Sequence, residues 1–225
     1  MKRDAVHVAL AKGGVLVERP QVRISAVHRV KPGALDVQQG HTILYINDGE
    51  ATFAAGAETQ RIVKGDVLVV PAGMTQALTI VAAPVSYLQI VVPAIEKKMD
   101  AIVHVPADKV AATMKKAAPL VDGPNFRVSG GHRPANTRDA SPVAEIHSSE
   151  ADLFYVIDGR ATQMLGGAMV GGKETSPGQI RGPRTEGGQT YQLDEGDIMW
   201  VPARMPHWFP EIPEALSYLL VKVFY

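Results

Sequence analysis

Short apolar runs alternate with turn signals along the whole chain. Runs such as "LFYVI" (153–157) and "DVLVV" (66–70) are rich in β-branched and aromatic residues, and turns such as "INDG", "VPAG" and "DEGD" separate them. This alternation is typical of an antiparallel sandwich or barrel. Because both faces of the runs are apolar, we expect the strands to be buried between two sheets.

Two segments add detail to this pattern. The stretch "PADKVAATMKKAA" (106–118) consists of good helix formers around a capping position at Asp108, and it predicts a short connecting helix. The last run, "ALSYLLVKVFY" (215–225), predicts a strand that closes the second sheet.

The chain nearly repeats itself. The matching segments are "RISAVHR" (23–29) with "RVSGGHR" (127–133), "ILYINDG" (43–49) with "LFYVIDG" (153–159), "GDVLVVPAGM" (65–74) with "GDIMWVPARM" (196–205), and "SYL" at 86 with "SYL" at 217. Matches in the same order indicate a duplicated domain. The second copy carries two insertions, a short one before Glu145 and one of about twenty residues between Gly159 and Gly196.

Composition narrows the class of partner. The chain has 225 residues, of which 46% are hydrophobic, so it can bury a sizeable core. It carries 23 basic and 23 acidic side chains, so neither a nucleic acid nor an anionic membrane is expected as a partner, and small molecules are favoured. The absence of cysteine excludes disulfides and thiolate ligands. No apolar run approaches about 18 residues and no signal peptide is evident, so a cytoplasmic location is expected.

Three metal-capable side chains fall close together in "AEIHSSEADLFYVIDG" (144–159). Glu145 and His147 are two residues apart on a predicted strand and therefore share a face. The polar stretch 148–151 predicts a four-residue hairpin loop, across which His147 and Asp152 are opposite one another. The spacing thus predicts that the three side chains converge.

These motifs resemble those of the cupin superfamily, and the repeat resembles a bicupin. "EIHSSEADLFYVIDG" is similar to the first cupin motif, with His147 in a histidine place and Asp152 in that of the usual glutamate, and "GDIMWVPARMPH" is similar to the second, with His207 as its last ligand. Glu145 stands where the family usually has a histidine, and Arg204 where it often has glycine.

The resemblance implies an all-β fold of two tandem jelly-roll (double-stranded β-helix) cupin barrels joined by a short helix. It predicts an N-terminal barrel (1–98), a linker with a helix (99–122) and a metal-binding barrel (123–225). The implied ligands of one divalent ion per chain are Glu145, His147, Asp152 and His207.

Imidazoles combined with carboxylates suit Mn, Fe, Co, Ni or Zn in the divalent state, and the pattern does not choose among these metals. The subset His147, Asp152 and His207 matches a two-histidine, one-carboxylate arrangement that leaves coordination positions open. Glu145 is either a fourth ligand or a general base beside the ion, and both roles stay open.

The first copy is an internal control. In the same register, the places of Glu145, His147, Asp152 and His207 are taken by Leu35, Val37, Thr42 and Gln76. Aliphatic, hydroxyl and amide side chains do not bind a transition metal tightly, so the first barrel is expected to be metal-free. His41, next to Thr42, is the one residue that could provide a weak metal site there, but the favoured interpretation is an exposed loop residue.

The segment 166–189 lies between the two motifs of the second copy only. Its glycines and its cationic side chains suggest a mobile lid that helps to bind a carboxylate-bearing ligand, and a solvated loop is the alternative. The candidate substrate-binding residues are Arg204, Arg181, Arg184, Trp208 and Phe154.

Two classes of function remain. The first is a metal-dependent enzyme acting on a small carbonyl- or carboxylate-bearing substrate by isomerase, lyase or dioxygenase chemistry, in which Glu145 or Asp152 assists proton transfer. The second is a cupin protein that binds a metal and a small ligand without turnover. In either class a homodimer is expected.

Overall fold

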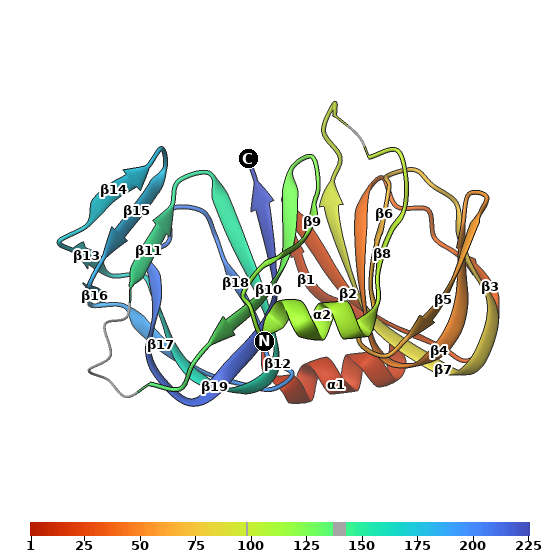
Figure 1. The fold of residues 1–225 in the computed structure, drawn as a ribbon, viewed down its shortest axis with the longest axis horizontal. Helices are drawn as coiled ribbons and strands as arrows, with labels where there is room; N and C mark the ends of the chain where they lie inside the picture. Colours follow the sequence, from red (N-terminus) through yellow and green to blue (C-terminus); the bar gives the residue numbers. More distant parts are fainter. Residues whose placement is uncertain (98, 137–142) are drawn as a thin grey trace. The chain divides into compact units, whose positions relative to one another are not determined.

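The computed structural model of the protein describes residues 1–97, 99–136 and 143–225. Figure 1 shows its helices and strands. In chain order they are α1 (Arg3–Lys12), β1 (Gly14–Arg19), β2 (Val22–Arg29), β3 (Gly33–Leu35), β4 (Gly40–Ala55), β5 (Glu58–Val63), β6 (Val67–Val70), β7 (Gln76–Pro93), β8 (Val103–Val105), α2 (Ala107–Met114), β9 (Pro119–Asp122), β10 (Phe126–Arg133), β11 (Ala144–His147), β12 (Glu150–Leu165), β13 (Ala168–Val170), β14 (Lys173–Ser176), β15 (Gln179–Gly182), β16 (Arg184–Glu186), β17 (Gln189–Asp194), β18 (Ile198–Val201) and β19 (His207–Phe224).

The chain divides into two compact units. The N-terminal unit comprises Asp4–Thr113 and Pro119–Phe126, and the C-terminal unit comprises Met1–Arg3, Met114–Ala118 and Arg127–Tyr225. Strands dominate both units, so the predicted all-β jelly-roll fold is confirmed. No helix among the described residues is long and apolar enough to cross a membrane.

The N-terminal unit is built on two long strands. Its sheet runs β1-β2-β7-β4-β6-β8, with β3 added to β7 and β5 added to β4. The pairing of β4 with β7 extends from Gly40↔Pro93 to Ala55↔Gln76, which curls the sheet over an apolar core. Phe53, Leu68 and Tyr87 are among the buried residues of that core.

The C-terminal unit is built on two long strands of the same lengths and in the same order. β12 and β4 each have 16 residues, and β19 and β7 each have 18. An aromatic cluster fills its core, where the ring of Phe154 lies 5.8 Å from that of Phe209 and 5.1 Å from that of Tyr218. The repeat in the sequence therefore corresponds to matching strands in the two units.

The Gly-Asp motif shared by both copies forms a turn. Gly65 and Gly196 adopt φ angles of 91° and 85°, which side chains other than glycine rarely adopt. The buried Asp66 accepts a hydrogen bond from the Val63 amide at 3.0 Å, and Asp197 accepts one from the Asp194 amide at 3.0 Å. The motif is therefore explained by turn geometry.

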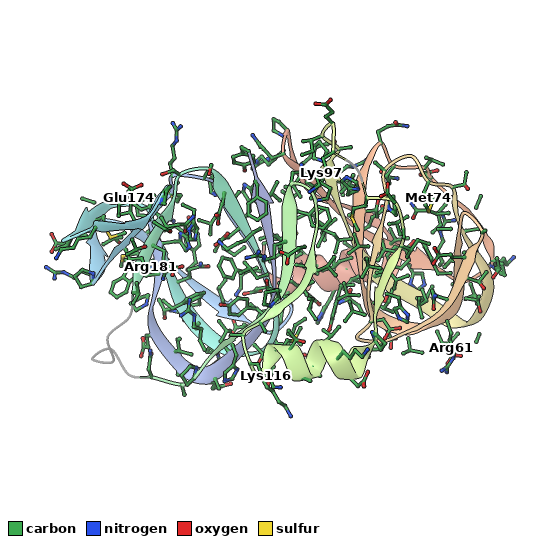
Figure 2. All side chains as sticks on the ribbon, turned by 45° about the horizontal axis from the view of Figure 1, so that its top comes forward. Arg61, Met74, Lys97, Lys116, Glu174 and Arg181 are labelled. Carbon is green, nitrogen blue, oxygen red and sulfur yellow. The ribbon has the colours of Figure 1, made fainter. Side chains whose placement is uncertain are left out.

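The inserted segment 166–189 is not the predicted long loop. It forms the strands β13, β14, β15 and β16, of which β13 pairs with β16 and β14 with β15. β15 in turn pairs with β11 through Glu145↔Arg181 and His147↔Gln179. Figure 1 shows these short strands grouped beside β11, and Figure 2 labels Glu174 and Arg181 on them. The strands β14 and β15 of the insertion therefore extend the sheet that carries the candidate site, whereas β13 and β16 form a separate two-stranded sheet.

The interpretation of His41 as an exposed loop residue is wrong. β4 begins at Gly40, and the His41 side chain is completely buried, with its ring centroid 5.8 Å from that of Phe126. Neither ring nitrogen has a hydrogen-bond partner within the described residues. Burial lowers the pKa of His41, because an imidazolium ion in an apolar environment loses its hydration.

This burial predicts a pH dependence of stability. His41 stays neutral in the folded state, so protonation of the unfolded state favours unfolding as the pH falls through the ordinary histidine pKa of about 6.5. Replacing His41 by leucine should reduce the loss in free energy of unfolding between pH 7 and pH 5, measured by urea titration with circular dichroism. The exposed His7 is the control, and an equal pH slope in H41L and wild type would contradict the prediction.

Candidate metal centre

The predicted ligands lie on three strands of the C-terminal unit. Glu145 and His147 are on β11, Asp152 is on β12, and His207 is the first residue of β19. Glu145 pairs directly with His207 across β11 and β19, and Asp152 pairs with Val201 at the end of β18.

The structure brings these residues together in a different way from that predicted. The connection from β11 to β12 is only Ser148–Ser149, and the two strands do not pair with each other. Instead, β11 pairs with β15 and β19, and β12 pairs with β17, β18 and β19. The expected hairpin is therefore wrong. The convergence depends on the segment 202–206, the β18–β19 link, whose Arg204 amide donates a 2.7 Å hydrogen bond to the His147 carbonyl.

The side chains converge on a small volume. Asp152 Oδ2 lies 3.4 Å from His147 Nε2 and 3.5 Å from His207 Nε2. Glu145 Oε2 lies 3.7 Å from His147 Nε2 and 4.0 Å from His207 Nε2. Donors bound at about 2.1 Å to a tetrahedral ion are about 3.4 Å apart, so the spacing is close to that of a metal site.

Hydrogen bonds orient both imidazoles. His147 Nδ1 lies 2.5 Å from the Gln179 amide oxygen, and His207 Nδ1 lies 3.0 Å from the Met205 carbonyl. These oxygens only accept, so Nδ1 carries the proton and Nε2 of the neutral ring keeps its lone pair. His207 Nε2 is buried and has no hydrogen-bond partner within the described residues. Such outer hydrogen bonds are typical of histidines that bind a metal, and the donor set fits a divalent ion.

The electrostatics keep Asp152 ionised. Burial alone would raise the pKa of Asp152, but the neighbouring imidazoles of His147 and His207 and the charge of Lys222 lower it well below its usual range. Burial alone would lower the pKa of His147, but the Asp152 carboxylate outweighs this effect and raises it.

Sequence reasoning missed a lysine at the centre. Lys222 Nζ on β19 lies 2.9 Å from Glu150 Oε2, 2.9 Å from Asp152 Oδ1 and 3.3 Å from His147 Nε2. Burial would lower its pKa, but the two carboxylates raise it, so the side chain is an ammonium ion. The repeat contained the signal, since "SYLQIVV" matches "SYLLVKV" and places Val91 where the second copy has Lys222.

The other candidate residues have different locations. Arg181 pairs with Glu145 Oε1 from the neighbouring strand, whereas Arg184 pairs with Glu186 at 2.6 Å on its own strand. Phe154 lies beside the site, with its ring 6.4 Å from that of His207. Trp208 follows His207 on β19 and therefore lies on the opposite face of the strand. The Arg204 side chain is exposed, and its contribution within the described contacts is through the backbone.

The corresponding positions of the N-terminal unit have no charge. Leu35 pairs with Gln76 as Glu145 pairs with His207, and Thr42 pairs with Val91 as Asp152 pairs with Lys222. Leu35, Thr42 and Gln76 are buried there. The same barrel positions therefore accept a neutral set of side chains.

Similar structures place this geometry in a known fold. Salicylate 1,2-dioxygenase from Pseudaminobacter salicylatoxidans superposes with a TM-score of 0.72 at 10% identity, covering 99% of this chain and 83% of its own. A cupin 2 conserved barrel domain protein from Leptotrichia buccalis gives 0.58 at 16% identity, covering 94% and 88%. The chain has a cupin-barrel fold.

Protein Ylba from E. coli is also similar in structure, with a TM-score of 0.60 at 14% identity, covering 94% of this chain and 81% of its own. No protein-family model matches the sequence, and no curated protein matches it. At these identities the likeness concerns the fold alone.

The β18–β19 link contains a conformation that an arginine rarely adopts. Arg204 has a φ of 66°, and Gly73, its counterpart in the N-terminal unit, has a φ of 76°. For a residue with a Cβ atom, this left-handed conformation costs about 1–2 kcal/mol. The departure from glycine at Arg204 therefore leaves backbone strain next to the candidate site.

We predict that Arg204→Gly raises the free energy of unfolding by about 0.5–1 kcal/mol, because relief of the strain outweighs the extra chain entropy of glycine. The matched change Gly73→Ala should lower it by about 1 kcal/mol, since space is available for the new methyl group and only the backbone angle opposes it. Scanning calorimetry measures both, and a lower unfolding temperature for R204G would contradict the assignment of strain.

Proposed function

We propose that the C-terminal unit is a metal-dependent enzyme site that binds one divalent transition metal and acts on a small carboxylate- or carbonyl-bearing molecule. The observation that carries this proposal is the pair of imidazole Nε2 atoms, oriented by Gln179 and Met205, that face the Oδ2 atom of Asp152. The proposed ligands are His147, His207, Asp152 and Glu145. In the two-unit architecture of a bicupin, the N-terminal unit is then the metal-free member.

The charge balance supports an anionic substrate. The carboxylates of Glu145, Glu150 and Asp152 carry three negative charges, and their ion-pair partners Arg181 and Lys222 carry two positive charges. The Arg133 guanidinium, whose charge acts on Glu145, adds a third positive charge. With neutral imidazoles these charges balance, and a divalent ion would leave an excess of positive charge. A carboxylate-bearing substrate would offset part of this excess, because a buried net charge is costly.

A bound divalent metal would polarise a carbonyl, enol or hydroxyl oxygen of the substrate. The protein contributes the orientation and the proton acceptors. Arg181 holds Oε1 of Glu145, and Oε2 of Glu145 is directed toward His147 and His207. This arrangement supports a role for Glu145 as a metal ligand through Oε2. Isomerase or lyase chemistry needs only these groups, and the likeness to salicylate 1,2-dioxygenase supports dioxygenase chemistry as the other reaction class.

We expect a metal content near one ion per chain for protein purified without chelators, confined to the C-terminal unit. His147→Ala combined with His207→Ala should remove the ion, as measured by elemental analysis. The matched control is Thr42→Val with Gln76→Leu in the N-terminal unit, which should leave the metal content unchanged. Two tightly held ions per chain, or one ion that persists in the histidine double variant, would refute the proposal.

The role of Glu145 can be tested separately. As a ligand, Glu145→Gln should weaken metal affinity by at least about tenfold, because an amide oxygen is a poor donor beside carboxylates. Glu145→His should restore binding. If Glu145 were only a base, the glutamine variant would keep its metal and lose turnover of the substrate. Full metal occupancy of E145Q after dialysis against a mild chelator would exclude the ligand role.

A further inference from the structure

Two groups of possible metal ligands overlap in the C-terminal unit. One contains Glu145, His147 and His207, and the other contains His147, Glu150 and Asp152. The Lys222 ammonium contacts every member of the second group, at 3.3 Å, 2.9 Å and 2.9 Å respectively. A cation of this protein therefore already lies among donors that suit a metal ion.

Lys222 and a metal ion would use the same lone pair. His147 Nδ1–H donates a hydrogen bond to Gln179 Oε1, so Nε2 offers the only lone pair of the neutral ring. The Lys222 ammonium donates toward this atom, and the atom also faces Asp152 Oδ2 and Glu145 Oε2. Because one lone pair cannot serve both cations, the hydrogen bond from Lys222 has to break when a metal binds His147.

Glu150 can keep the Lys222 ammonium when a metal displaces it from His147 and Asp152. Glu150 Oε2 already accepts from Lys222, and Glu150 Oε1 accepts from the Gln179 amide at 2.9 Å. The same Gln179 orients His147, so the metal ligand and the lysine acceptor are held by one side chain. Lys222 can therefore give up His147 and Asp152 while it keeps one carboxylate partner.

The N-terminal unit indicates that the fold does not need this lysine. Val91 occupies the corresponding position beside Thr42, and Gly40, which pairs with Pro93, corresponds to Glu150, which pairs with Phe224. The lysine and its acceptor are thus both missing from the unit that also lacks the metal-type donors.

We propose that Lys222 is a built-in cation that competes with the metal ion for His147 and Asp152, and that Glu150 favours metal binding by holding the displaced ammonium. This inference rests on the proposed function. On this proposal Lys222 and Glu150 are positioning residues: Lys222 lowers the affinity for the metal, and Glu150 raises it.

The test is a cycle of variants titrated with Co²⁺ alone by calorimetry, which needs no substrate. Lys222→Met should tighten Co²⁺ binding about tenfold or more, the equivalent of one hydrogen bond to a charged group. Glu150→Gln should weaken binding in the protein that keeps Lys222. In the Lys222→Met background the same glutamine change should have little effect, because no ammonium remains to be held.

Three outcomes would decide against the inference. Equal or weaker Co²⁺ binding by Lys222→Met would exclude competition while leaving the proposed metal site intact. Weakening by Glu150→Gln in both backgrounds would make Glu150 a direct ligand instead. Absence of Co²⁺ binding in wild type and all variants would overturn the proposed function together with the inference.

Two further controls separate an effect on metal binding from a loss of folding. Lys222→Val introduces the residue type found at the corresponding position of the N-terminal unit, and it should tighten Co²⁺ binding as Lys222→Met does. Circular dichroism melting curves identify any variant that has lost its structure, and Glu150→Gln provides a measurement in which the lysine is retained.

Discussion

The geometry of the candidate site depends on the β18–β19 link, residues 202–206. Val201, directly before the link, pairs with Asp152, and His207, directly after it, pairs with Glu145. The amide of Arg204 in the middle bonds to the His147 carbonyl. Backbone hydrogen bonds thus fix the Cα positions of all four proposed ligands, and the left-handed angle at Arg204 allows the link to close. A site held in this way is organised before any ligand arrives.

This organisation creates an electrostatic problem. Three carboxylates and two imidazoles lie close together, and Asp152 and His147 are almost fully buried, so the negative charges need partners in the absence of a metal. Arg181 supplies one from the inserted strand β15, and Lys222 supplies the other from β19. The two cations occupy different positions relative to the histidines. Arg181 contacts Glu145 Oε1, the oxygen on the side away from the histidines, whereas Lys222 contacts a histidine nitrogen directly.

Local patterns in the sequence predicted the fold and most of the site. The features that they did not predict depend on pairing between strands that are far apart in the chain. The spacing of His147 and Asp152 predicted their convergence, yet the expected hairpin does not exist. The two strands are connected through β18 and β19, which lie about fifty to seventy residues further along the chain. Lys222 belongs to no motif and lies in an apolar strand, so only its repeat counterpart Val91 could have indicated it. In the insertion, the Ser-Pro-Gly at 176–178 between two short polar runs was a hairpin signal.

Comparison of the two units indicates why the charges are present. The N-terminal unit forms the same long strand pair with Leu35, Thr42, Gln76 and Val91 at the corresponding positions. The barrel therefore does not need acids, imidazoles or a lysine there in order to fold. Because buried ion pairs replaced by well-packed neutral residues often leave stability equal or higher, the charged cluster of the C-terminal unit is not explained by folding. The oriented lone pairs of His147 and His207 favour the binding of a cation as the reason for the cluster.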